Sequence, residues 1–256
     1  MSATRYYESI TSVLTRIHTT QQQKLQDAAQ LLANSIGGAG RAYLFGSGHS
    51  VIPVMDVFPR YGSFVGFYPL YDPRLMWSNV IGPHGARELL WIERREGYVE
   101  QFLQSYPFGP QDCLIVFSHG GLNAAPIEAA LYARARGSHV ISVSSHANAS
   151  IAKKTHSSGK ALSDVADIAI DNCVAPEDAQ VDVGNREKIG AGSTMAAVFV
   201  AMALVAETGA RLAAAGRPLT TFVSPNVAGV AKDHNFRVFD EYASHWYERA
   251  PEPVIR

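Results

Sequence analysis

The chain carries little charge of either sign. Only 18% of its 256 residues are Asp, Glu, Lys or Arg, and 22 basic against 23 acidic residues leave a net charge of -1. Binding to a nucleic-acid backbone needs a basic surface, so nucleic acid is not an expected partner. With 47% hydrophobic residues the chain can bury a large core, and its length fits one large α/β domain or two small ones.

Cysteine and metal-binding motifs are also scarce. The two cysteines, Cys113 and Cys173, lie in apolar runs without a second thiol at redox or zinc spacing, so we expect buried, reduced side chains. None of the nine histidines forms an HxxxH or HExxH pair. We therefore expect no metal and no cofactor.

Long apolar runs are missing as well. The N-terminus has no apolar signal-peptide core, and the longest uncharged stretch, residues 191–206, is shorter than the roughly 20 residues of a membrane span. We interpret that stretch as a buried helix. The sequence therefore predicts a cytoplasmic protein that does not bind a membrane.

Strand and helix patterns alternate along the chain. Apolar residues three or four apart over 6–36 predict a helix or helix pair that ends at Gly37-Gly38. Buried strands are predicted at 41–45, within 62–75, and at 113–117, 139–145 and 168–174, with a short strand or loop at 221–227. Helices are predicted at 86–105, 126–136, 192–214 and 236–246. This order predicts a three-layer α/β/α sandwich in a single domain, with 1–38 as an N-terminal helical extension and 40–245 as the core.

Two polar glycine turns each follow a buried strand. Gly46-Ser47-Gly48-His49-Ser50 follows the first, and Ser118-His119-Gly120-Gly121-Leu122-Asn123 follows the strand at 113–117. The C-terminal ends of parallel strands share one edge of a sheet, where backbone N–H groups at helix starts suit a phosphate. Val51 replaces the third glycine of a dinucleotide motif, and no P-loop ending is present. For either turn alone, a plain loop is the alternative.

Together these segments resemble the sugar isomerase (SIS) domain family. FGSGHS (45–50) and FSHGGLNAAPIEAALYARARG (117–137) match the family, while ERREGY (93–98), THSSGKAL (155–162), SPNV (224–227) and DHN (233–235) match a subgroup described as phosphosugar isomerases. The resemblance implies a flavodoxin-like, five-stranded parallel sheet. It also implies a homodimer or homotetramer with active sites at subunit interfaces, and a small sugar or sugar phosphate as partner.

The expected substrate-binding residues lie in these motifs. They are Ser47, Gly48, His49, Ser50, Ser118, His119, Gly120, Asn123, His156 and Ser158. Gly120 departs from the family, which normally has a second serine there, so one hydroxyl that would hold phosphate is missing. His119 could supply a donor instead, or the ligand could be an unphosphorylated or otherwise altered sugar. For His156 and Ser158, a solvated polar loop is the alternative.

Moving a carbonyl between the first two carbons of a sugar requires a base and usually an acid. Glu96 is our first choice for the base, with Glu93 as its substitute one helical turn earlier; solvated surface charge is the alternative for Glu96. His234 is our choice for ring opening or proton shuttling, because an imidazole titrates near neutral pH. By the resemblance it would act from a neighbouring subunit, and a surface histidine is the alternative.

The sequence therefore predicts an aldose–ketose isomerase that works through an enediol intermediate. A non-catalytic sugar-phosphate-binding protein is the main alternative. A lyase like the muramic acid phosphate etherases ranks third, because their Glu-Cys-Pro-Pro segment is absent. The resemblance does not identify the sugar.

Overall fold

A five-stranded parallel sheet forms the centre of the molecule, as predicted. The computed structural model describes residues 1–76 and 85–248. The strand order is β2-β1-β3-β4-β5, with β1 at Ala42–Gly46, β2 at Phe67–Pro69, β3 at Cys113–Phe117, β4 at His139–Ser144 and β5 at Ile168–Asp171. The strands are apolar almost throughout because helices cover both faces of the sheet.

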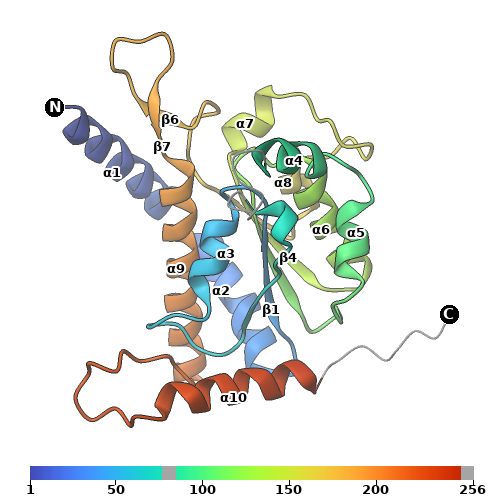
Figure 1. Cartoon of the computed structure of the whole chain (residues 1–256), viewed down its shortest axis with the longest axis vertical. Coiled ribbons are helices and arrows are strands. Elements are labelled where there is room, and N and C mark those ends of the chain that lie inside the picture. The colour runs from blue at the N-terminus through green and yellow to red at the C-terminus, as the bar shows by residue number, and fades with distance from the viewer. Residues whose placement is uncertain (77–84, 249–256) are drawn as a thin grey trace.

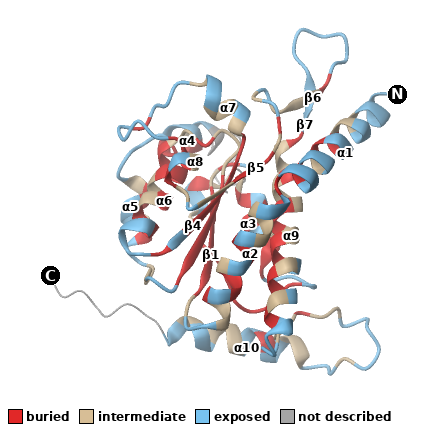
Figure 2. Ribbon diagram, turned by 180° about the vertical axis from the view of Figure 1, so that it is seen from behind, coloured by how far each residue is buried: buried red, intermediate tan, exposed pale blue. Residues whose placement is uncertain are grey.

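Two helical layers enclose the sheet and give it two cores (Figure 1). One layer contains α2 (Gln22–Gly37), α3 (Val51–Val57) and α9 (Ser193–Ala214), and the other contains α4 (Gly85–Ile92), α5 (Tyr98–Leu103), α6 (Ala124–Ala135) and α8 (Leu162–Val165). Successive strand residues point to opposite cores, so Leu44 packs in the first and Tyr43 in the second. Figure 2 shows the buried sheet between these layers. The three-layer prediction is confirmed.

The N-terminal region is a helix pair, α1 (Ser2–Thr20) followed by α2. Helix α9 is the one described helix that is long and apolar enough to cross a membrane by length and composition, and 44% of its most apolar window is buried. It packs against α1, α2 and α3, which matches the predicted buried helix.

Several elements differ from the sequence prediction. The helix predicted at 86–105 is two helices, because the chain turns at 93–97 and Gly97 adopts a φ of 87° that favours glycine. Glu96 therefore lies in this turn, and its predicted helical position is wrong. The segment 221–227 takes the loop alternative of its prediction, apart from a single bridge between Phe64 and Thr221. Unpredicted elements are the short helices α7 (His146–Ile151), α8 and η1 (Pro73–Leu75), and the antiparallel hairpin of β6 (Ala179–Val181) and β7 (Ile189–Ala191).

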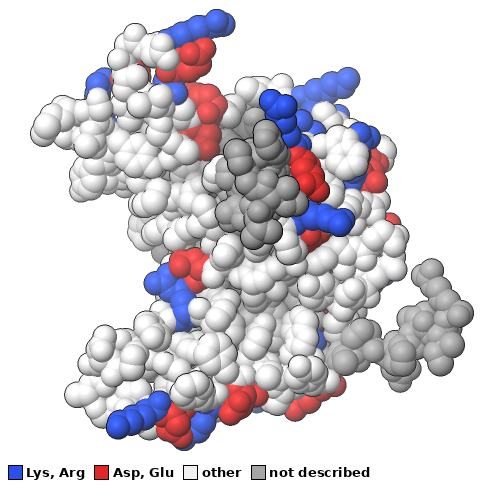
Figure 3. Space-filling view, in the orientation of Figure 1, with Lys and Arg blue, Asp and Glu red and all other residues white. Residues whose placement is uncertain are grey.

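Charged side chains on the face shown in Figure 3 are spread out and mixed in sign. Many form local pairs, such as Lys188 Nζ with Glu177 Oε1 at 2.9 Å near the hairpin. This distribution follows from the small and balanced charge of the sequence.

Helix α10 (His234–Tyr247) crosses the end of the sheet where the strands begin (Figure 1). Arg41, at the start of β1, is buried and donates hydrogen bonds to the backbone carbonyls of His245 and Trp246. Its guanidinium also lies 5.3 Å from the centre of the Tyr68 ring and 5.5 Å from that of Trp246. These contacts fix the last helix at the edge opposite the two polar turns.

Candidate functional site

The turn after β1 is tightly folded and depends on its glycines. A Cβ at Gly46 would lie 2.2 Å from the carbonyl oxygen of Ser50, so any residue other than glycine would clash there. Gly48 has a φ of 61°, and its N–H donates to the carbonyl of Leu75 at 2.8 Å. Ser47 and Ser50 are consequently held at the C-terminal end of β1, where α3 begins.

The turn after β3 is closed by its own serine. The hydroxyl of Ser118 accepts a hydrogen bond from the N–H of Gly121 at 3.1 Å, and Gly121 has a φ of 63°. Asn148 Nδ2 donates to the carbonyl of Gly120 at 2.9 Å. Asn123 then precedes α6 without a side-chain bond to that helix.

The two turns line a shared hollow with a water-accessible volume of about 10 Å³, room for about one water molecule in this ligand-free structure. It is lined by His49, Ser50, Ser118, His119, Val143, Asn172, Ser193, Thr194 and Ala197. The hydroxyl-bearing residues of both turns therefore meet on the α3 and α9 side of the sheet. This is the convergence that a shared ligand site requires.

His119 is held within this hollow by the protein itself. Its Nδ1 lies 3.2 Å from Asn172 Nδ2, and its Nε2 lies 3.4 Å from the carbonyl oxygen of Pro176. Asn172 is buried at the end of β5, and its Oδ1 accepts from the N–H of Val174. Both ring nitrogens thus have partners, so His119 does not present a free donor in place of the hydroxyl missing at Gly120.

The N-terminus of α9 also borders the hollow. The N–H groups of this helix end already bind the carboxylate of Asp178. Asp178 accepts hydrogen bonds from the N–H of Gly192 at 2.9 Å, the N–H of Ser193 at 2.6 Å and the hydroxyl of Ser193 at 2.8 Å. Because an internal anion satisfies these donors, the start of α9 is not an open phosphate site.

Glu93 reaches the first turn from the opposite helical layer. Its residue is 7% exposed, and the hydroxyl of Ser47 donates to Glu93 Oε2 at 3.0 Å. The carbonyl of Glu93 accepts from the N–H of Ala125 at 2.9 Å, which ties the turn at 93–97 to the start of α6. Burial raises the pKa of the Glu93 carboxyl, and the bond from Ser47 only partly opposes this effect.

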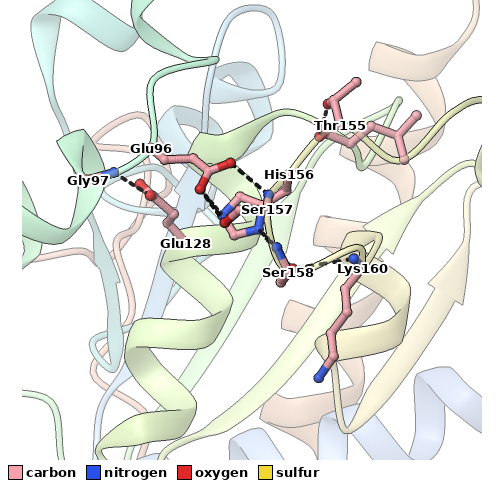
Figure 4. Close-up of polar contacts among 9 residues, drawn as sticks. Glu96, Gly97, Glu128, Thr155, His156, Ser157, Ser158 and Lys160 are labelled. Atoms are coloured by element: carbon pink, nitrogen blue, oxygen red, sulfur yellow. Dashed lines mark hydrogen bonds and ion pairs between the residues drawn. The ribbon is translucent and has the colours of Figure 1, made fainter.

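Glu96 lies in a different environment from Glu93 (Figure 4). Its carboxylate accepts a hydrogen bond from the N–H of Ser157 at 2.7 Å and a second from the Ser157 hydroxyl. These two donors lower the pKa of Glu96. The two carboxyls that sequence spacing treats as equivalent therefore differ in burial and in the direction of their pKa shifts.

His156 and Ser158 belong to the same cluster. The Ser158 N–H donates to His156 Nδ1 at 3.1 Å, and the Ser158 hydroxyl lies 2.8 Å from the same nitrogen. Thr155 donates to the carbonyl of Leu122 at 3.1 Å, so this segment is attached to the turn after β3. The ERREGY and THSSGKAL motifs thus meet in space.

His234 lies far from these groups within one chain. It begins α10, and its Nε2 donates to the carbonyl of Thr221 at 2.8 Å. Thr221 forms a bridge with Phe64, which precedes β2, so His234 lies at the end of the sheet where the strands begin. The structure therefore does not bring His234 and the two turns together in one copy.

The fold and these motifs are those of a known family. The sequence model of the SIS domain matches residues 5–145, more than half of the chain. The chain belongs to the SIS domain family. It is also 31% identical over 242 residues to a UPF0309 protein of Halalkalibacterium halodurans, covering 94% of this chain and 98% of the relative. A UPF0309 protein of Streptomyces coelicolor is 31% identical over 248 residues, covering 96% and 97%.

Solved structures share the SIS fold with this chain at low sequence identity. A phosphoheptose isomerase from Francisella tularensis has a TM-score of 0.52 and 14% identity, covering 80% of this chain and 95% of that one. The phosphoheptose isomerase of Neisseria gonorrhoeae has a TM-score of 0.51 and 16% identity, covering 81% and 96%. These likenesses establish the fold.

The sequence motifs do not identify every residue of the candidate site. Asn172, Ser193 and Thr194 line the hollow, yet none belongs to a recognised motif. A usable signal was present for Asn172, which directly follows a predicted apolar strand at the ligand-binding edge of a parallel sheet. The N-terminus of a long helix was the corresponding signal for Ser193 and Thr194.

Proposed function

We propose that this SIS protein is an aldose–ketose isomerase that acts on a sugar phosphate through an enediol intermediate. The observation that carries the proposal is the buried carboxyl of Glu93 bonded to Ser47 in the turn after β1. A carboxyl with a raised pKa beside a polar turn is suited to accept and return a proton.

We assign the base to Glu93 rather than to Glu96. In the proposed reaction, Glu93 removes the proton from the carbon next to the carbonyl, and the carbonyl oxygen gains a proton to give the enediol. Glu93 then returns the proton to the former carbonyl carbon, while the hydroxyl on the neighbouring carbon loses its proton and becomes the new carbonyl, which completes the isomerisation. The lowered pKa of Glu96 makes it the weaker base, which supports this choice.

The anionic end of the sugar would bind between the two turns. Ser50 and Ser118 both border the hollow, and α6 starts beside the second turn. We propose a homodimer or homotetramer, because His234 could assist ring opening only from a second copy. We also propose the cytoplasm as the compartment, since Cys113 and Cys173 are unpaired thiols.

Proton exchange in heavy water tests the isomerase proposal. The protein is incubated with a panel of sugar phosphates and free sugars, and exchange at the second carbon is followed by NMR. Glu93→Gln should reduce exchange by about a hundredfold or more, the usual contribution of a general base, while ligand-induced thermal stabilisation persists.

The control variant is Glu100→Gln, which makes the same change at an exposed carboxylate on α5. It should retain full exchange activity. Undiminished exchange in Glu93→Gln would remove Glu93 from the role of base.

A non-catalytic sugar-phosphate-binding protein is the second candidate. It is favoured by Gly120, which supplies no hydroxyl where the family normally has one, and by His119, whose ring nitrogens both have protein partners. Thermal stabilisation by ligands without exchange anywhere in the panel would select this function.

A further inference from the structure

Glu96 and His156 lie opposite each other and are separated by a short gap (Figure 4). Glu96 Oε2 lies 3.9 Å from His156 Nε2, which is too far for a direct hydrogen bond. An oxygen atom about 2.8 Å from each of the two atoms, the ordinary length of a hydrogen bond, would lie about 2 Å to one side of the line that joins them. A single hydroxyl group beside the pair could therefore bridge the two side chains.

The donor and acceptor on the two sides of the gap are complementary. The Ser158 N–H donates to His156 Nδ1, so in the neutral ring the proton is on Nε2 and points across the gap. In the part of the chain that the structure describes, Nε2 makes no hydrogen bond. A hydroxyl could accept from this N–H and donate its own proton to the carboxylate of Glu96.

Both side chains are held in place by neighbouring serines. Ser157 bonds to both oxygens of the Glu96 carboxylate, and Ser158 bonds to the far nitrogen of His156. The His156 side chain is only 6% exposed, whereas that of Glu96 is 40% exposed. Groups that are fixed before a ligand arrives lose little conformational freedom when it binds.

We propose that Glu96 and His156 form a hydroxyl-binding subsite that recognises one hydroxyl group of the sugar. This inference rests on the proposed function for its substrate class, and it gives Glu96 a role in specificity instead of proton abstraction. Thr155 attaches the subsite to the turn after β3 through the carbonyl of Leu122. Glu128 accepts from the N–H of Gly97 and thereby supports the turn that carries Glu96.

Titration with D-glucitol tests the subsite without requiring catalysis. This polyol has hydroxyls but no carbonyl and no phosphate, so isomerisation cannot contribute. In protein with ¹⁵N-labelled histidine, molar D-glucitol should shift the Nε2–H signal of His156 in a saturable manner. Inorganic phosphate, which lacks a carbon-bound hydroxyl, should leave that signal unchanged.

The chain offers a matched control pair in His139 and Asp167. Their Nδ1 and Oδ2 atoms are 4.0 Å apart, but the His139 side chain is 53% exposed and the pair lies at the start of β4. A saturable shift confined to His156 supports the subsite. No shift at His156, or an equal non-saturating shift at both histidines, overturns it.

Two variants connect the signal to the carboxylate. Glu96→Gln should raise the apparent Kd for D-glucitol about tenfold or more, because it removes a charged hydrogen-bond acceptor. Ser157→Ala keeps both Glu96 and His156 and should raise the Kd for D-glucitol by only about threefold. An unchanged Kd in Glu96→Gln would overturn the proposal. A shift at His156 without exchange activity would keep the subsite and reject the isomerase.

Discussion

Replacing Gly120 by serine tests how this chain departs from its family. A Cβ at Gly120 meets no atom closer than Asn148 Nδ2, at 3.7 Å, which is ordinary van der Waals contact. The backbone of Gly120 is also outside the left-handed region. A serine therefore fits without strain, and we expect Gly120→Ser to change the free energy of unfolding by less than about 1 kcal/mol.

The added hydroxyl should strengthen the binding of an anion. A hydrogen bond to a charged group contributes about 1.5–3 kcal/mol, and each 1.4 kcal/mol is tenfold in affinity. We thus expect Gly120→Ser to lower the Kd for a sugar phosphate by about tenfold or more, measured by isothermal titration calorimetry. The same variant should leave the binding of the corresponding free sugar almost unchanged.

Gly121→Ser is the matched control one residue later. Gly121 has a φ of 63°, and its Cβ would lie 3.3 Å from that of Ser144. This substitution should destabilise the fold by about 1–2 kcal/mol, because a side chain strains a left-handed backbone. Equal phosphate affinity in Gly120→Ser and the parent protein would refute the view that the missing hydroxyl limits phosphate binding.

Two further predictions concern buried charge. Burial raises the pKa of Glu93, so its contribution to stability is present below the unfolded-state pKa and is lost as pH rises through the folded-state pKa. Glu93→Gln should therefore gain in Tm relative to the parent as pH increases from about 4 to about 8, and a constant Tm difference would contradict this. Arg41→Met removes the donor to the carbonyls of His245 and Trp246 and should lower the free energy of unfolding by about 2–4 kcal/mol in a denaturant titration. A loss below about 0.5 kcal/mol would show that α10 is held by other contacts.

The strands of the sheet were predictable because each is a short, almost uniformly apolar run. A single continuous helix was predicted at 86–105 because Val99 and Leu103 continue the apolar spacing of the first helix. This prediction was wrong, since a turn that ends at Gly97 separates two helices. The hairpin at 179–191 gave no signal because β7 is exposed throughout and Val181 is the only buried residue of β6, so neither strand shows an apolar alternation.

The two turns of the site were predictable from the glycines and hydroxyls after neighbouring strands. The choice between Glu93 and Glu96 was not, because it depends on where α4 ends and on which carboxyl then points inward. Contacts between distant segments, such as His119 with Asn172, also have no local pattern. His234 could not be assigned to one edge of the sheet from the order of elements alone.

Glu93 and the hollow between the turns lie on opposite sides of the central sheet. Glu93 follows α4 in one layer, whereas the hollow is closed by the first residues of α9 in the other. A molecule that touches both must lie over the rim formed by the strand ends. The length of its carbon backbone, more than any single contact, then decides whether one molecule can contact Glu93 and the hollow at the same time.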